Sequence, residues 1–210
     1  MEAYLDNSAT TRVDAQVQEL MKKLMDVDFG NPSSRHQKGV VAEGYIKEAR
    51  QKIAATLKVD PKELIITSGG TESNNMALIG TALAAKRKGN HIITTAVEHP
   101  SVKATASFLE EQGFRITFLS VDSRGQISLE DLKEALTPDT ILVSIMYVNN
   151  EIGTIQPVEE AAKLVHATVP GAVFHVDAIQ AYGKVMIRPK QQGIDLLSVS
   201  SHKFHGPKGA

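Results

Sequence analysis

Lys203 is the residue whose surroundings most favour chemistry. It follows the apolar segment 195–200 and lies in the run Ser-Ser-His-Lys-Phe-His-Gly-Pro, which covers residues 200–207. A lysine in a partly desolvated pocket gives up its proton more easily, and its free amine can form a Schiff base with a carbonyl group. A solvent-exposed loop lysine is the ordinary alternative, but no other run of charged residues marks this segment as a solvated face. We therefore expect Lys203 to be a catalytic amine.

Two more titratable residues stand at the predicted ends of apolar strands. Asp177 ends the segment 173–177, and His99 follows Glu98 shortly after the segment 91–95. The Asp177 carboxylate could cap a helix or pair with a buried cation. Opposite a pyridine nitrogen it would keep that nitrogen protonated, which makes the ring an electron sink. A single histidine is usually a packing residue, but a catalytic or binding role for His99 is favoured because other reactive groups are expected beside it.

A glycine-rich turn could bind a phosphate group. Residues 68–73 read Ser-Gly-Gly-Thr-Glu-Ser and lie between a predicted strand and a predicted helix. Glycines allow a tight turn, and the N–H groups at a helix N-terminus attract anions. The alternative is an ordinary turn with Thr71 as the helix N-cap, and the residues favour neither reading. A nucleotide P-loop is excluded because no Gly-Lys-Ser or Gly-Lys-Thr follows.

The sequence does not predict a metal centre. It contains no cysteine, which excludes disulfides, thiolate zinc sites and a cysteine nucleophile on this chain. Histidines are present but show none of the spacing of a metal site; they include His91, His99, His175, His202 and His205.

The pattern of apolar residues predicts the elements that position these groups. Helical spacing recurs in 41–57, 76–83, 101–112, 129–136 and 158–165. Short apolar strands are expected at 64–67, 91–95, 115–119, 141–148, 173–177 and 195–200. Strands alternating with helices predict an α/β fold of three layers, α/β/α, with a mainly parallel sheet. Ligands bind such sheets at the carboxyl ends of the strands, where the polar residues named above would meet.

Composition narrows the class of protein. The 210 residues are 42% hydrophobic and 22% charged, with a formal net charge of −1, which is ordinary for a globular domain. The near-neutral charge gives no reason to expect direct binding of nucleic acid or of an acidic membrane. The N-terminus lacks the features of a signal peptide, and no apolar run is long enough to span a bilayer. We therefore expect a cytoplasmic protein.

Seven motifs in order along the chain resemble the cysteine desulfurases, a family of the class V aminotransferases. They begin with Tyr-Leu-Asp-Asn-Ser-Ala-Thr-Thr (4–11) and Gly-Asn-Pro-Ser-Ser (30–34) and continue with the glycine-rich turn (67–74) and Glu98-His99. The last three are Val-Asn-Asn-Glu-Ile-Gly-Thr-Ile-Gln-Pro (148–157), His-Val-Asp-Ala-Ile-Gln (175–180) and the lysine segment (201–209). No single motif decides the resemblance, but the ordered set is specific and covers the chain. It resembles the bacterial branch serving iron–sulfur cluster assembly and tRNA thiolation.

The resemblance implies a cofactor, pyridoxal 5′-phosphate, and a role for each site residue. Lys203 would bind the cofactor covalently, Asp177 would pair with its ring nitrogen, and His99 would stack on the ring and assist proton transfer. Its phenolic oxygen would lie near Gln180 and Asn150, and its phosphate would be held by Gly70, Thr71, Ser200 and His202. The substrate would be L-cysteine, converted to L-alanine while its sulfur passes to a cysteine of the enzyme as a persulfide.

The resemblance also implies parts that this sequence lacks. Family members are nearly twice as long, and their catalytic cysteine, a substrate-binding arginine and most of a small domain lie beyond the matched half. We therefore expect a fragment: residues 1–15 as an arm belonging with the small domain, and 16–210 as an incomplete large domain of the type I pyridoxal-phosphate transferase fold. The chain would stop before the last strand of the sheet, leaving two sheet edges bare.

The resemblance also implies binding partners, and it leaves alternative functions open. The family implies a homodimer and a sulfur-acceptor protein, either an assembly scaffold or a tRNA-thiolation enzyme. Without a cysteine this chain alone is expected to release no sulfide. Another class V pyridoxal-phosphate aminotransferase or lyase, which would need no cysteine, stays open, as does a non-catalytic chain that binds the cofactor.

Overall fold

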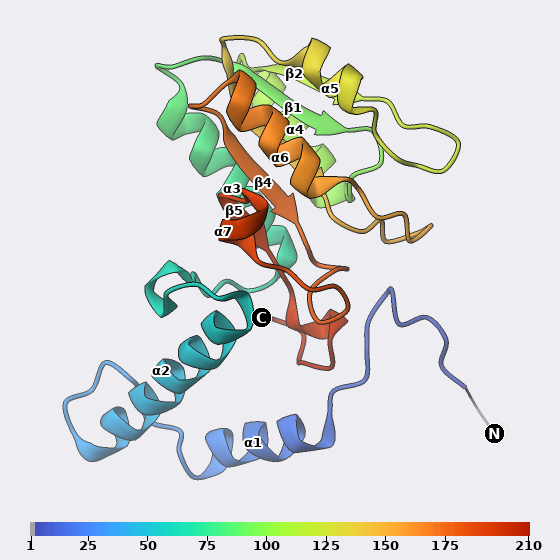
Figure 1. Cartoon of the computed structure of the whole chain (residues 1–210). Helices are drawn as coiled ribbons and strands as arrows, with labels where there is room; N and C mark the ends of the chain where they lie inside the picture. The colour runs from blue at the N-terminus through green and yellow to red at the C-terminus, as the bar shows by residue number, and fades with distance from the viewer. Residues whose placement is uncertain (1–2) are drawn as a thin grey trace.

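A five-stranded, all-parallel sheet forms the centre of the computed structural model, which describes residues 3–210 (Figure 1). The strands lie in the order β2-β1-β3-β4-β5. Their bounds are β1 (His91–Thr95), β2 (Arg115–Leu119), β3 (Thr140–Met146), β4 (Val173–Asp177) and β5 (Leu196–Ser198). Strands β1, β3 and β4 are almost entirely buried, as expected for parallel strands covered on both faces.

Helices cover both faces of the sheet. Buried side chains of β1 divide between the two faces: Ile92 packs in the cluster that includes Leu78 of α3 (Gly70–Ala85) and Val102 of α4 (Pro100–Glu111). Ile93 packs in the cluster that includes Leu132 of α5 (Leu129–Ala135) and residues of α6 (Val158–Thr168). The short elements α7 (Pro189–Gln192) and η2 (Ser201–Lys203) flank β5. The predicted three-layer α/β/α architecture is thereby confirmed.

One predicted strand is absent. Residues 64–67 follow η1 (Pro61–Glu63) and form no strand, although Leu64 has an extended backbone. A strand exists only where its backbone pairs with a neighbour, and the sheet ends at β5, whose strand partner is β4. Ile65 and Ile66 are consequently 70% and 58% exposed. The strand expected at 64–67 was therefore wrong, and with it the bare sheet edge expected there; β5 lies at one end of the sheet order.

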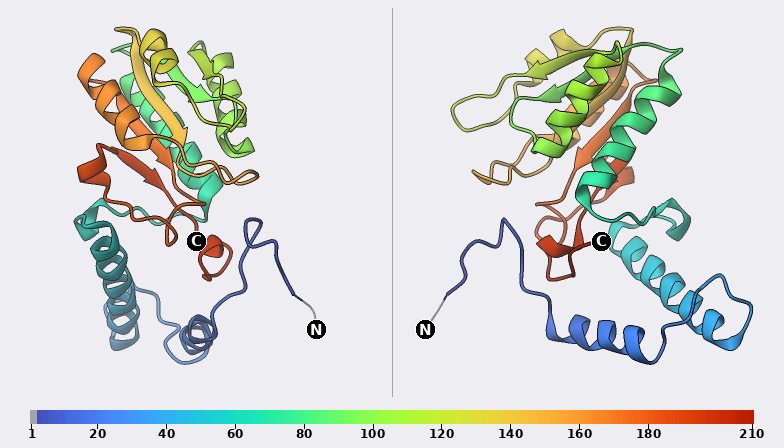
Figure 2. Two further views of the ribbon diagram at one scale, coloured as in Figure 1. Left: turned by 45° about the vertical axis from the view of Figure 1, so that its right-hand side comes forward. Right: turned by 180° about the vertical axis from the view of Figure 1, so that it is seen from behind.

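The N-terminal quarter of the chain extends away from the sheet (Figures 1 and 2). It holds α1 (Ala15–Asp26), which has no buried residue and which was not predicted, and α2 (Gln37–Leu57). The C-terminal end of α2 joins the body: Leu57 packs in the core, and Arg188 donates to the Thr56 carbonyl at 2.5 Å. Many apolar side chains of this part are exposed, including Met25 at 71% and Phe29 at 65%.

The N-terminal arm returns to the sheet body before α1 begins. Thr11 donates from its backbone N–H and its hydroxyl to the His202 carbonyl, at 2.8 and 2.9 Å, and Asp14 N–H donates to the His205 carbonyl at 2.9 Å. These bonds hold residues 11–14 against the segment that carries Lys203. Residues 1–2 of the predicted arm lie outside the described residues. No helix among residues 3–210 is long and apolar enough to cross a membrane.

Candidate active site

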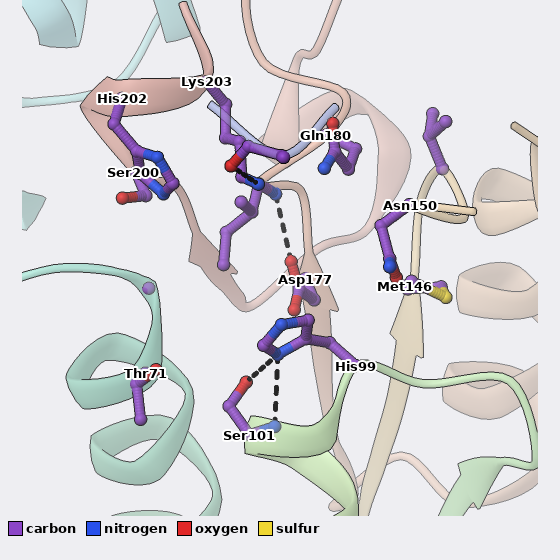
Figure 3. A pocket seen from close by; sticks show the side chains of 14 residues that line it. Thr71, His99, Ser101, Met146, Asn150, Asp177, Gln180, Ser200, His202 and Lys203 are labelled. Atoms are coloured by element: carbon purple, nitrogen blue, oxygen red, sulfur yellow. Dashed lines mark hydrogen bonds between the residues drawn. The ribbon is translucent and has the colours of Figure 1, made fainter. Parts of the chain in front are cut away.

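A cavity of about 270 Å³ opens at the carboxyl ends of the strands (Figure 3). Every residue that the sequence nominated for the site lines it: Gly70, Thr71, His99, Asn150, Asp177, Gln180, Ser200, His202 and Lys203. Five residues not nominated also line it: Ala9, Ser101, Met146, Val148 and Ile179. The cavity therefore collects side chains from separate segments of the sequence at the edge where parallel sheets bind ligands.

The N-terminus of α3 points into this cavity without a side-chain cap. Gly69, not Thr71, is the N-cap residue, and no side chain accepts from the N–H groups of the first turn. The alternative reading of Thr71 as the N-cap was therefore wrong. Uncapped N–H groups at a helix N-terminus form an anion site, which fits a phosphate group. The Glu72 carboxylate does not cap these N–H groups, because it accepts hydrogen bonds from the backbone N–H and the hydroxyl of Ser68, both at 2.6 Å.

Gly69 is required by the backbone geometry of this turn. Its φ of 140° and ψ of −177° lie in a region reserved for glycine. We expect Gly69→Ala to lower the free energy of unfolding by about 1–3 kcal/mol. The matched control is Gly80→Ala in the same helix, where an added Cβ meets nothing within 4 Å; it should raise the free energy of unfolding by about 0.5–1 kcal/mol. Urea denaturation of both variants measures the difference, and equal effects would contradict the assignment.

Asp177 is a buried acid that faces the cavity from the end of β4. It is 4% exposed, and its two carboxylate oxygens accept from Ile179 N–H at 3.0 Å and from the Asn74 amide at 2.8 Å. Burial raises the pKa of Asp177 above its usual range, although these hydrogen bonds oppose the rise. A buried carboxylate is best stabilised by a cationic partner. A protonated pyridine nitrogen in the cavity is such a partner.

Lys203 reaches the cavity from η2 beneath the N-terminal arm. Its Nζ donates to the carbonyls of Ser8 and Ala9 at 2.5 and 2.8 Å, and the Gln180 amide donates to the same Ser8 carbonyl at 2.7 Å. Partial burial, together with the positive charge of Lys184, lowers the pKa of Lys203. A lowered pKa increases the fraction of free amine, which is the form that reacts with a carbonyl group.

The loop that follows β3 is held in place by Asn149, the neighbour of the nominated Asn150. The Asn149 side-chain oxygen accepts from the N–H groups of Glu151 and Ile152 at 2.9 and 3.0 Å. Its amide donates to the Val97 carbonyl at 3.0 Å, which ties this loop to the end of β1. The two neighbouring asparagines therefore differ in position: Asn149 holds the loop through its hydrogen bonds, and Asn150 lines the cavity.

Glu98 lies under the site as a buried acid. Its Oε1 accepts from Met146 N–H at 2.8 Å and from the Thr95 hydroxyl at 2.9 Å, while Oε2 has no partner among residues 3–210. Burial raises the pKa of Glu98 to about 8, and the nearby Asp177 charge adds to the rise. The raised pKa favours the protonated form of Glu98 at neutral pH.

This protonation predicts a pH dependence of stability. A raised folded-state pKa adds stability below the ordinary value, near 4.5, and the gain is lost as the pH rises through about 8. Glu98→Gln removes that titration, so the stability of the variant relative to wild type should rise steadily from pH 4.5 to 8. Urea denaturation across this range measures it. A stability difference between Glu98→Gln and wild type that stays constant with pH would contradict the raised pKa of Glu98.

Sequence reasoning missed the residues that support the site from behind. Asn74 lies within the quoted glycine-rich motif but received no role, and Ser101 follows His99 by two residues. The usable signal was their position: each lies in the first turns of a helix that starts at the predicted ligand edge. The contact between Ser101 and His99 is local, at the N-cap of α4, whereas the hydrogen bonds of Asn74 to Asp177 and to Ser101 arise only once α3 packs against β4 and α4.

Comparisons with known proteins agree with this site. The family model described as "Aminotransferase class-V" matches residues 3–210. The cysteine desulfurase IscS of Dictyoglomus turgidum is 50% identical over 208 residues, 99% of this chain and 52% of that protein. The putative cysteine desulfurase IscS 1 of Bacillus subtilis is 50% identical over 206 residues, 98% of this chain and 54% of that protein. The chain spans about half the length of the curated relatives it matches.

Solved structures show the same fold. A "NIFS-LIKE PROTEIN" superposes with a TM-score of 0.97 at 44% identity, covering 100% of this chain and 57% of that one. A structure described as "SspA in complex with cysteine" gives a TM-score of 0.95 at 40% identity, covering 99% and 59%. The expected fold, the large domain of type I pyridoxal-phosphate transferases, is thereby confirmed. Relatives of this kind depend on pyridoxal phosphate. With a matching family model over nearly its whole length, the chain belongs to the class-V aminotransferases.

Proposed function

We propose that this chain supplies the cofactor-binding part of a pyridoxal-phosphate-dependent cysteine desulfurase, which converts L-cysteine to L-alanine and an enzyme-bound persulfide. The observation that carries the proposal is the convergence of all nine nominated residues on one cavity, in a chain 50% identical to cysteine desulfurases. When bound, the cofactor supplies a carbonyl that reacts with amines and a ring that withdraws electrons from the substrate α-carbon.

The residues present fit this cofactor. Lys203 would hold it through an amine whose pKa is already lowered, and Asp177 would keep a proton on the ring nitrogen. The uncapped N-terminus of α3 would hold the phosphate together with the side chains of Ser200 and His202. His99 would lie against the ring and move protons, and the side chains near the phenolic oxygen would be Gln180 and Asn150.

The remaining parts of the activity lie outside this chain. It contains no cysteine, so we expect no persulfide on it and no sulfide release from L-cysteine by this chain alone. We further propose that residues 1–15 belong with a second, smaller domain and that 16–210 form part of the large domain. The family also suggests a homodimer in the cytoplasm that passes sulfur to an acceptor protein, for iron–sulfur cluster assembly or tRNA thiolation.

A labelling experiment tests the proposed function. The chain is incubated with pyridoxal phosphate and reduced with borohydride, and peptide mass spectrometry locates the pyridoxyl group, expected on Lys203. Adding L-cysteine before reduction should lower this labelling, because the substrate amine competes with Lys203 for the same carbonyl. 3-Mercaptopropionate, which keeps the thiol and the carboxylate of L-cysteine but lacks the amine, is the control and should leave the labelling unchanged. Labelling of many surface lysines without preference would contradict a cofactor site.

A further inference from the structure

Asn74 is a polar residue in a fully buried position, where an apolar side chain would be expected. It lies in α3, is 0% exposed, and its side-chain oxygen has no hydrogen-bond partner among residues 3–210. An unpaired buried oxygen carries a free-energy cost that an apolar side chain of the same shape would avoid. The compensating contacts are made by the amide nitrogen, which donates to Asp177 Oδ2 at 2.8 Å and to Ser101 Oγ at 3.0 Å.

The direction of these hydrogen bonds is fixed by Asp177. An ionised carboxylate only accepts hydrogen bonds, so the amide nitrogen rather than the oxygen of Asn74 must face it. The second amide hydrogen then goes to the Ser101 hydroxyl, which becomes an acceptor on that side. Its own hydrogen remains for the other neighbour within reach, His99 Nδ1 at 2.8 Å.

His99 Nδ1 therefore accepts two hydrogen bonds. The first comes from the Ser101 hydroxyl, and the second comes from the Ser101 backbone N–H at 3.1 Å (Figure 3). A ring nitrogen that accepts carries no hydrogen, so the neutral imidazole carries its single hydrogen on Nε2. Nε2–H is then the group that His99, a residue of the cavity wall, can offer to a ligand.

We propose that Asn74 and Ser101 are positioning residues that join Asp177 to His99 and hold neutral His99 with its proton on Nε2. This inference rests on the proposed function, since Asp177 and His99 are the two groups assigned to the cofactor ring. The chain Asp177–Asn74–Ser101–His99 fixes both relative to each other and presents His99 as a hydrogen-bond donor toward the cavity.

A second buried polar chain on the same sheet provides the matched control. Ser198 contacts Ser73 at 2.8 Å and His175 at 3.0 Å, and His175 contacts Ser144 at 2.8 Å. Ser198 is 1% exposed, and its side chain makes no hydrogen bond to Asn74, Ser101 or His99. Ser198→Ala thus removes buried hydrogen bonds in the same layer without touching the proposed chain.

The test is the ¹⁵N spectrum of the histidine side chains in the full chain, with and without pyridoxal phosphate. At a pH where histidines are neutral, long-range ¹H–¹⁵N correlations show which ring nitrogen carries the hydrogen, and His99→Gln identifies the His99 signals. We expect a protonated Nε2 and a hydrogen-bonded Nδ1 in the wild type. Asn74→Leu and Ser101→Ala should both shift the Nδ1 resonance toward that of a weaker hydrogen bond, whereas Ser198→Ala should not.

Each outcome decides the proposal. A hydrogen on Nδ1 in the wild type would overturn it, and that measurement stands even if Asn74→Leu fails to fold. An Nδ1 shift in Ser101→Ala with none in a folded Asn74→Leu would overturn the link through Asn74. The tautomer is read without any activity, so a chain that shows it but forms no adduct on Lys203 would contradict the proposed function alone.

Discussion

Replacing Lys203 with alanine is expected to abolish the borohydride-stable pyridoxyl adduct on this chain. Lys203 Nζ is the amine that the fold holds at the cavity, and its lowered pKa favours the neutral, reactive form. Alanine removes the amine and leaves the backbone of η2 unchanged. Intact-mass measurement after reduction gives the fraction of labelled chain, expected to fall from the major species to the background of surface lysines.

Lys184 provides a matched control for this experiment. It lies near Lys203, it is partly buried, and burial also lowers its pKa. If proximity and a lowered pKa sufficed, Lys184 would take the label. We expect Lys184→Met to keep the adduct on Lys203 and to move its formation to higher pH, because one charge that lowers the Lys203 pKa is removed. Persistent site-specific labelling in Lys203→Ala would mean that another residue is the amine.

Asp177→Asn is expected to have opposite effects on cofactor affinity and on stability. The substitution keeps the shape of the side chain and removes the charge proposed to hold the ring nitrogen protonated. Removing one partner of a buried charge pair costs about 3 kcal/mol or more, which corresponds to at least ~100-fold weaker binding. Fluorescence or absorbance titration with pyridoxal phosphate measures this loss. The control is Asp195→Asn. Asp195 precedes β5, at the end of the sheet opposite the cavity, and its substitution should leave the affinity unchanged.

The stability of the cofactor-free chain should change in the other direction. The Asp177 pKa is raised by burial, so this acid adds stability below its ordinary value near 3.8 and loses it as the pH rises through the raised pKa. Asparagine does not titrate, so the stability of Asp177→Asn relative to wild type should increase over that range. Denaturation curves at acid and neutral pH measure the difference. If Asp177→Asn loses affinity but its stability relative to wild type does not increase with pH, burial of the Asp177 charge does not destabilise the cofactor-free chain, which would contradict this interpretation.

The position of the candidate site could be predicted from the sequence, because ligand sites of parallel sheets lie at the carboxyl ends of the strands. Most nominated residues end or follow an apolar strand, and the carboxyl ends of parallel strands share one edge. Gly70 and Thr71 instead begin a helix whose preceding segment forms no strand. The alternation of strands and helices therefore predicts that Lys203, Asp177 and His99 lie together at that edge. The resemblance to a known family then assigned roles that the residues alone left open, such as the phosphate site at Gly70 and Thr71.

Two elements differ from the sequence expectations, for different reasons. The segment 64–67 has the composition of a strand, but a strand needs a hydrogen-bonded neighbour, and none lies beside it in the described chain. The helix α1 carries apolar residues at helical spacing, Val17, Leu20, Met21 and Leu24, which the sequence reasoning did not use, although none of them is buried. At 64–67 the absence of a strand partner among the described residues overrides the local pattern, whereas α1 forms as its local pattern favours without being buried.

The residue pattern was enough to predict the fold class, the sheet edge at which the cavity opens and nine of the fourteen residues that line it. These follow from periodicity and from the order of residues along the chain, which are local properties. The environment of those side chains depends on the three-dimensional packing: the raised pKa of Asp177 and Glu98, the lowered pKa of Lys203, and the hydrogen bonds from Asn74 through Ser101 to His99. Burial and hydrogen-bond direction depend on contacts between residues far apart in the sequence, such as Asn74 and Asp177, and these contacts exist only once α3 packs on the sheet.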